Sequence, residues 1–196
     1  ALDPTMHDAW FGVGLYHYYA DVAPTAAKIL RVLLLLPGGD RKQGLAEMQR
    51  ARKDGALLHG EIDYQLHVLD LWYEKEPRHA ISLLEGLRKQ YPLNPHFMQT
   101  IAEVQDTYLH DIPASLHTWQ ALADAARAGR VRQSAMALTL ARLGTALQLD
   151  RLFETDAAIT QLRDVIASAP AAPVNSARNA GRPQTAIGAI HANSSA

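Results

Sequence analysis

The stretch Pro77–Phe97, read as PRHAISLLEGLRKQYPLNPHF, decides the fold of this chain. A single apolar stripe follows it at helical spacing, at i, i+3, i+4, i+7 and i+11: Ala80, Leu83, Leu84, Leu87 and Tyr91. Pro77 suits a first helical turn, because the N–H that it lacks would have had no partner within the helix. Pro92 cannot continue a helix. The spacing therefore predicts one amphipathic helix over 77–91, with a defined start and a defined end.

One pattern recurs along the chain: a small residue, a larger residue four positions later and an apolar residue seven positions later. The four copies are Gly44/Met48/Ala51, Ala80/Leu84/Leu87, Ala114/Thr118/Ala121 and Ala158/Leu162/Val165, and their starts are 36, 34 and 44 residues apart. The small residue lets two helices of a hairpin cross closely, and the apolar residues fill the gap between hairpins. We therefore predict an all-α fold of four antiparallel hairpins without strands: about 6–54 with an inserted helix at 25–36, 56–91, 95–128 and 131–168.

Both the spacing and several motif residues resemble tetratricopeptide (TPR) repeats, whose period is 34 residues. The matching positions are Trp10 and Gly14 in an opening helix, the pair Leu143–Gly144, the closing prolines Pro92 and Pro170, and ALDP at 1–4 as the end of a preceding repeat. The resemblance covers roughly residues 1–170. It implies a divergent TPR-like superhelix, an α-solenoid from a longer bacterial-type chain, and it says more about fold than about function.

Composition excludes several classes of protein. Hydrophobic residues make up 48% of the 196, which is enough to bury a core. Lys and Arg number 19 against 20 Asp and Glu, so no cationic surface for nucleic acid is expected. The absence of Cys removes disulfides and thiolate metal sites and fits either the cytoplasm or the periplasm. The longest apolar run, 32–36, is far shorter than the ~20 residues of a membrane span, so we expect a soluble protein.

The two ends of the sequence differ from its middle. The chain begins with Ala inside a repeat signature, so we expect an upstream portion that adds repeats, a signal peptide or a catalytic domain. Residues 171–196 contain no aromatic residue, no Leu and no acid, and cannot bury enough apolar surface to offset their ordering entropy. We predict a low-complexity tail there, disordered or loosely docked.

The inserted segment 25–36, TAAKILRVLLLL, predicts an apolar helix that has to be covered. It could fold back across the repeats beside Tyr18 and Trp72, or it could contact another chain. We predict internal docking, which would confine a peptide site to the second and third hairpins. After Pro37-Gly38-Gly39, Asp40 is the expected N-cap of the next helix.

Metal and acid–base chemistry are the enzymatic alternatives. The closest His pairs, His110/His117 and His59/His67, are seven and eight residues apart, whereas a helical pair that binds one metal is usually at i, i+4. The candidate carboxylates for acid–base chemistry are Asp63, Asp70, Glu74 and Glu76 near one helix and Glu103 and Asp106 on the next. Charged side chains on helices are, however, more commonly just solvated. We therefore expect no catalytic residue, no cofactor, no metal site and no enzyme activity.

The resemblance implies that the first helices of the hairpins line a concave groove. The residues expected there are Asp8, Tyr18, Tyr19, Gln65, Trp72, His96, Gln99, Glu103, Asp106 and Gln148. Such aromatics, amides and carboxylates suit a peptide with basic and apolar anchors. The competing interpretation is that Tyr18 and Trp72 pack against the inserted helix. We predict a non-catalytic scaffold that binds a protein or peptide; the alternative is a repeat domain of a larger enzyme or assembly.

Overall fold

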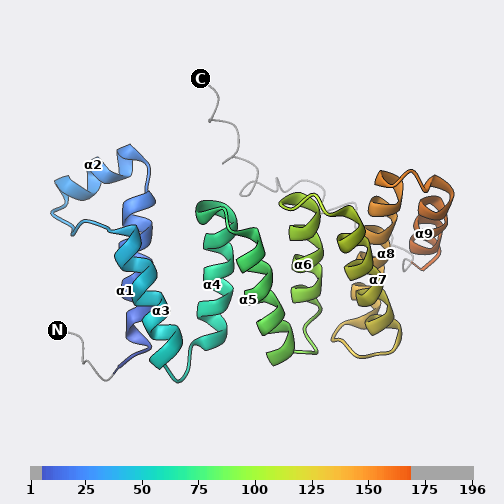
Figure 1. The fold of residues 1–196 in the computed structure, drawn as a ribbon, viewed down its shortest axis with the longest axis horizontal. Coiled ribbons are helices and arrows are strands. Elements are labelled where there is room, and N and C mark those ends of the chain that lie inside the picture. The colour runs from blue at the N-terminus through green and yellow to red at the C-terminus, as the bar shows by residue number, and fades with distance from the viewer. Residues whose placement is uncertain (1–5, 169–196) are drawn as a thin grey trace, which may run out of the picture.

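The computed structural model describes residues 6–168, and all of its regular elements are helices (Figure 1). The expectations for residues 1–4, Pro170 and the segment 171–196 lie outside this range. The elements are α1 (Ala9–Val22), α2 (Thr25–Leu33), α3 (Arg41–Asp54), α4 (His59–Leu69), the π-helical turn η1 (Asp70–Glu74), α5 (Pro77–Gln90), α6 (Pro95–Thr107), α7 (Ile112–Arg127), α8 (Ser134–Arg151) and α9 (Thr155–Ser168). No strand occurs among the described residues, so the all-α prediction is confirmed.

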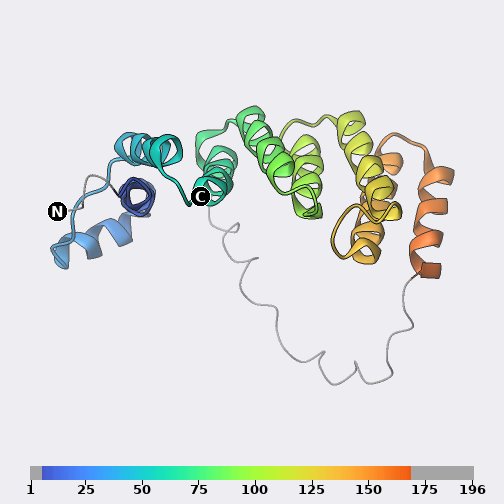
Figure 2. The ribbon, with the colours of Figure 1, turned by 90° about the horizontal axis from the view of Figure 1, so that it is seen from below.

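The helices lie in a row along the long axis of the molecule, in the order of the sequence apart from α2 (Figures 1 and 2). α1 packs on α3, and from α4 to α9 each α-helix packs on the next. Three clusters of buried apolar residues follow one another along this row. The first is centred on Tyr18 and Met48, the second on Leu84 and the third on Trp119. Within 6–168 no helix is long and apolar enough to cross a membrane.

Helix starts follow from local chemistry that is visible in the sequence. The side chains of Asp40, Asn94 and Asp111 accept backbone N–H groups at the starts of α3, α6 and α7, at 2.9, 3.1 and 3.0 Å. These bonds satisfy N–H groups that have no partner within the helix. Pro77 and Pro95 occupy first-turn positions of α5 and α6. The predicted N-cap at Asp40 is therefore confirmed.

The small residue of the first repeat copy is where α1 and α3 cross. A Cβ atom on Gly44 would lie 2.6 Å from the carbonyl oxygen of Gly14, and one on Gly14 would lie 2.6 Å from that of Gly44. Real Cβ contacts essentially never fall below 3.0 Å. In the second copy, Ala80 is fully buried together with Leu84. Small side chains at these positions let the neighbouring helices approach.

The third repeat copy was predicted one residue out of register. Ser115, Trp119 and Leu122 are buried, in place of Ala114, Thr118 and Ala121. The Ser115 hydroxyl donates a 2.8 Å hydrogen bond to the Ala102 carbonyl of α6. The Trp119 indole lies directly against Gly144 of α8, where a Cβ atom would overlap it. Burial of this large aromatic side chain therefore sets the rotation of α7. In the fourth copy only Ala158 is buried, because α9 ends the described row.

A polar network joins the first hairpin to the second. The Tyr18 side chain is fully buried, and its hydroxyl donates a 2.5 Å hydrogen bond to Oε1 of Glu74 at the end of η1. Arg41, at the start of α3, binds both oxygens of the same carboxylate, through Nε at 2.8 Å and Nη2 at 2.6 Å. Glu74 thus binds side chains from both α1 and α3. It also gives the buried Tyr18 hydroxyl a hydrogen-bond partner.

The prediction that the inserted helix docks internally is wrong. None of the residues of α2 is buried. Its cations face α1: Arg31 Nη1 donates a 2.5 Å hydrogen bond to the Ala20 carbonyl, and Lys28 Nζ lies 3.9 Å from Asp21. The polar side of the amphipathic helix therefore meets the body, and its apolar side points away. Neither Tyr18 nor Trp72 packs under it, since Tyr18 contacts Tyr73 and Trp72 is 65% exposed.

Candidate functional site

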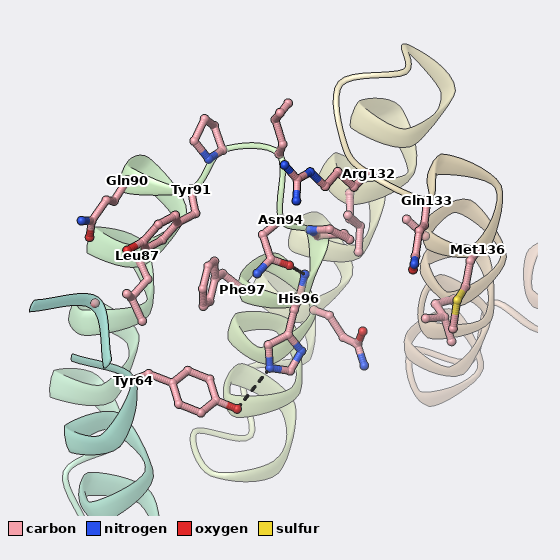
Figure 3. Close-up of a pocket in the computed structure, with 18 of the residues that line it drawn as sticks. Tyr64, Leu87, Gln90, Tyr91, Asn94, His96, Phe97, Arg132, Gln133 and Met136 are labelled. Carbon is pink, nitrogen blue, oxygen red and sulfur yellow. Dashed lines mark hydrogen bonds between the residues drawn. The ribbon is translucent and has the colours of Figure 1, made fainter. Parts of the chain in front are cut away.

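A groove of about 970 Å³ crosses the middle of the row (Figure 3). Its walls are the start of α4, the end of α5, the α5–α6 loop, the start of α6 and the start of α8. Its lining residues are Gly60, Glu61, Tyr64, Leu87, Gln90, Tyr91, Pro92, Leu93, Asn94, Pro95, His96, Phe97, Gln99, Leu122, Arg132, Gln133, Met136, Ala137 and Leu140. The groove thus lies on the first helices of three successive helix pairs.

The base of the groove is apolar and continuous with the core. Leu87, Phe97, Leu122 and Ala137 contribute to it, and each is less than a tenth exposed. Met136 stands on its α8 wall with 60% of its surface exposed. Apolar side chains with a few polar groups at the edge are typical of ligand-binding clefts. This base can therefore hold apolar side chains of a bound partner.

Two loops that form the rim are tied together by the backbone. The amide N–H of Arg132 donates a 2.8 Å hydrogen bond to the carbonyl of Leu93, which connects the α7–α8 loop to the α5–α6 loop. Gln133 follows in the left-handed conformation, at φ 51°, and turns the chain into α8. The Asn94 side chain fixes the start of α6 by accepting the amide of His96. The rim is consequently pre-formed, which reduces the entropy lost on binding.

Polar side chains lie at both ends of the groove. Tyr64 and His96 face each other, with their hydroxyl oxygen and Nε2 atoms 3.4 Å apart (Figure 3). The Arg132 guanidinium reaches from the opposite rim toward the α5–α6 loop (Figure 3). Within 6–168 no carboxylate lies within 4.0 Å of it. A guanidinium above an apolar base suits a carboxylate of a ligand.

His67 lies against Tyr64 and is buried. Its side chain is 3% exposed, and burial lowers its pKa to about 4. The Tyr64 ring meets it edge to face at 4.6 Å between centroids. An imidazole with this pKa is uncharged at neutral pH, so it contributes an uncharged wall beneath Tyr64.

Of the residues predicted for the groove, His96 and Gln99 line it. Glu103 lies one turn further along α6 and accepts a 2.8 Å hydrogen bond from Gln99 Nε2. Tyr19 and Gln65 are bonded to each other between α1 and α4, at 2.8 Å, outside the groove.

The other predicted groove residues have local partners or lie elsewhere. Asp8 accepts the amides of residues 56, 57 and 58, each at 3.1 Å, and so organises the turn before α4. Asp106 is bound by Arg151 and by Gln148 Nε2. Tyr18 is buried in the core, and Trp72 is exposed on η1. The carboxylates expected to attract a basic peptide are therefore not in the groove.

Sequence reasoning missed Tyr64, Phe97, Arg132 and Met136 as groove residues. One available signal was spacing: Gly60 and Tyr64 on α4, like Met136 and Leu140 on α8, are four residues apart on one helix face. Arg132 gave no such signal, because it lies in a loop that packing between hairpins brings to the rim.

The carboxylates considered for acid–base chemistry are mostly held in ion pairs. Asp63 is bound by Arg52. Burial raises the pKa of Asp70, whose Oδ2 lies 2.7 Å from His79 Nδ1. Residues 6–168 contain no cluster of three His, Asp or Glu side chains placed to hold a metal ion.

Comparisons with known proteins give no match: no family model fits the sequence, and no curated protein or solved structure is significantly similar. The function of the groove is therefore inferred from its own geometry and chemistry.

Proposed function

We propose that this chain is a TPR-like helical-repeat protein that acts as a non-catalytic scaffold and binds a peptide segment of a partner protein. The observation that carries the proposal is the groove across α4, α6 and α8, with its apolar base and with Arg132 on its rim. In a repeat protein, such surfaces made by successive repeats are the usual binding sites.

The groove chemistry supports a more specific proposal for the partner than the sequence does. Buried apolar groups such as Phe97 and Leu122 offer contacts for one or two apolar anchors. Arg132 adds a cation at the rim. Among the described residues that line the groove, the one acidic residue is Glu61. We therefore expect a peptide with apolar anchors next to an acidic residue, in place of the basic peptide first predicted.

The proposal predicts a charge-dependent affinity. Peptides are selected against the full-length chain from a displayed random library, and their affinity is measured by isothermal titration calorimetry. Arg132→Glu is expected to weaken binding by about tenfold to a hundredfold, because a cation facing the peptide carboxylate becomes an anion. Arg130→Glu, an exposed residue outside the groove, makes the same change of charge two positions away and is expected to have little effect.

A second pair of variants tests the apolar base on one helix. Met136→Ala removes an exposed side chain from the groove wall, and Leu147→Ala removes one of similar exposure, 56%, from α8 outside the groove. We expect only Met136→Ala to weaken binding, by about threefold to tenfold. Equal affinities for all four variants and the wild type would contradict the groove as the binding site.

A further inference from the structure

The described part of the chain carries a second candidate surface, far from the groove. Seven consecutive or nearly consecutive aliphatic residues of α2 and the turn after it are between 51% and 92% exposed: Ile29, Leu30, Val32, Leu33, Leu34, Leu35 and Leu36. α2 stands out from the end of the row beside α1, and α1 is its neighbour among the helices of residues 6–168 (Figures 1 and 2). An aliphatic surface of this extent on a monomer usually marks an interaction site.

The size of this surface matches one half of a protein–protein interface. From their exposed fractions, the seven side chains present on the order of 800 Å² of accessible surface, about what each partner contributes to an interface of standard size. A short peptide would leave much of it in water. A partner with an apolar surface of equal size and shape is needed.

The charges around α2 do not favour a lipid surface. Helices that lie on membranes present several Lys and Arg residues to anionic headgroups. Residues 25–36 contain two cations, Lys28 and Arg31, and both are engaged by α1. Because these cations face their own chain, they would not repel a second copy that approached the apolar side.

We propose that α2 and residues 34–36 form a homodimer interface in which the α2 helices of two copies pack against each other about a twofold axis. In such an interface both partners use the same patch, so the apolar side of α2 in one copy covers the apolar side of α2 in the other. Aliphatic side chains at i, i+3 and i+4, such as Ile29, Val32 and Leu33, interdigitate with those of the partner helix. This interface is independent of the groove on α4 to α8.

The absence of Cys from the chain permits a direct test by cross-linking. Val32→Cys places one thiol near the middle of the patch, where Val32 is 67% exposed, and Leu57→Cys places one in the α3–α4 turn, where Leu57 is 85% exposed. Under mild oxidation at micromolar concentration, Val32→Cys is expected to form a disulfide-linked dimer and Leu57→Cys to stay largely monomeric. Similar yields from the two variants would overturn the proposal.

Sedimentation measurements on the full chain provide the second test. The wild type is expected at twice the 21.5 kDa of one chain, and Leu30→Asp with Leu33→Asp at 21.5 kDa with an unchanged circular dichroism spectrum. Leu57→Asp serves as the control and should remain dimeric. A monomeric wild type across the micromolar range would overturn the proposal, and so would a dimer that survives the double substitution. Monomers that sediment with phosphatidylcholine–phosphatidylglycerol vesicles would show that the patch binds lipid.

Discussion

Gly14→Ala is expected to destabilise the protein by about 2 kcal/mol, whereas Gly12→Ala is expected to stabilise it by roughly 0.5–1 kcal/mol. The Cβ atom added at Gly14 would lie 2.6 Å from the Gly44 carbonyl oxygen and 2.9 Å from the Met48 amide nitrogen, so two backbones would have to separate. A Cβ atom at Gly12 meets nothing within 4 Å and only improves helix propensity. Urea unfolding of the three proteins measures both changes.

This comparison separates close packing from helix propensity within one helix. The two substitutions are chemically identical and lie two residues apart in α1. If both variants gained stability, α1 and α3 would not cross at Gly14 and Gly44, and the arrangement of the first hairpin would be wrong. Gly44→Ala is expected to follow Gly14→Ala, because its Cβ atom would meet the same backbone from the other side.

Glu74→Ala is expected to destabilise the protein by about 2–3 kcal/mol, because it removes a charged hydrogen-bond acceptor and leaves a buried hydroxyl without a partner. The Tyr18 side chain is fully buried, and Glu74 accepts its O–H at 2.5 Å. Arg41 is 40% exposed, so its share of the loss is reduced by solvent. Thermal unfolding measures the effect. The control is Asp124→Ala, which removes an exposed pair with Arg127 and should change stability by less than about 0.5 kcal/mol.

The same carboxylate predicts how stability depends on pH. Hydrogen bonds from Arg41 hold the pKa of Glu74 below its ordinary value of 4.5. A carboxylate whose pKa is lower in the folded state stabilises the fold fully above its unfolded pKa, and this contribution is lost as pH falls through the folded pKa. The difference in unfolding free energy between the wild type and Glu74→Gln should therefore be constant near neutral pH and shrink in acid. A difference that grows on acidification would contradict this network.

Much of the helical structure could be predicted because its signals are local. The apolar stripe of 77–91 and the prolines around it are sufficient for a helix, and the structure has α5 at Pro77–Gln90. The rotation of α7 about its axis could not be predicted from local sequence. Ala114 and Ser115 are both small enough for a helix crossing, and only the fit of Trp119 against Gly144 of the next helix decides between them.

The position of α2 shows a second limit of sequence reasoning. Its apolar composition predicts that the helix is covered by its own chain, because leaving several Leu side chains in water is unfavourable. The structure instead turns Lys28 and Arg31 toward α1. Which side of an amphipathic helix meets the body depends on such tertiary contacts, which the pattern of the helix alone does not contain.

The groove was predicted only in part for the same reason. His96 and Gln99 could be placed because they share one exposed face of α6. Tyr64 and Arg132 belong to other hairpins, and they reach the groove because of how successive helix pairs pack and because the Arg132 amide binds Leu93. Contacts between distant residues of this kind have no periodic signature in a single sequence.

The most direct test of the proposed scaffold function is amide hydrogen exchange of the full chain with and without a selected peptide. Binding in the groove predicts slower exchange in three separate segments, 60–64, 87–99 and 131–140, with little change in α1, α2 and α9. These segments are distant in sequence, and all three contribute residues to the groove. Protection confined to residues 25–36 would contradict a peptide site across α4, α6 and α8. Protection of other helices that leaves these three segments unchanged would contradict it as well.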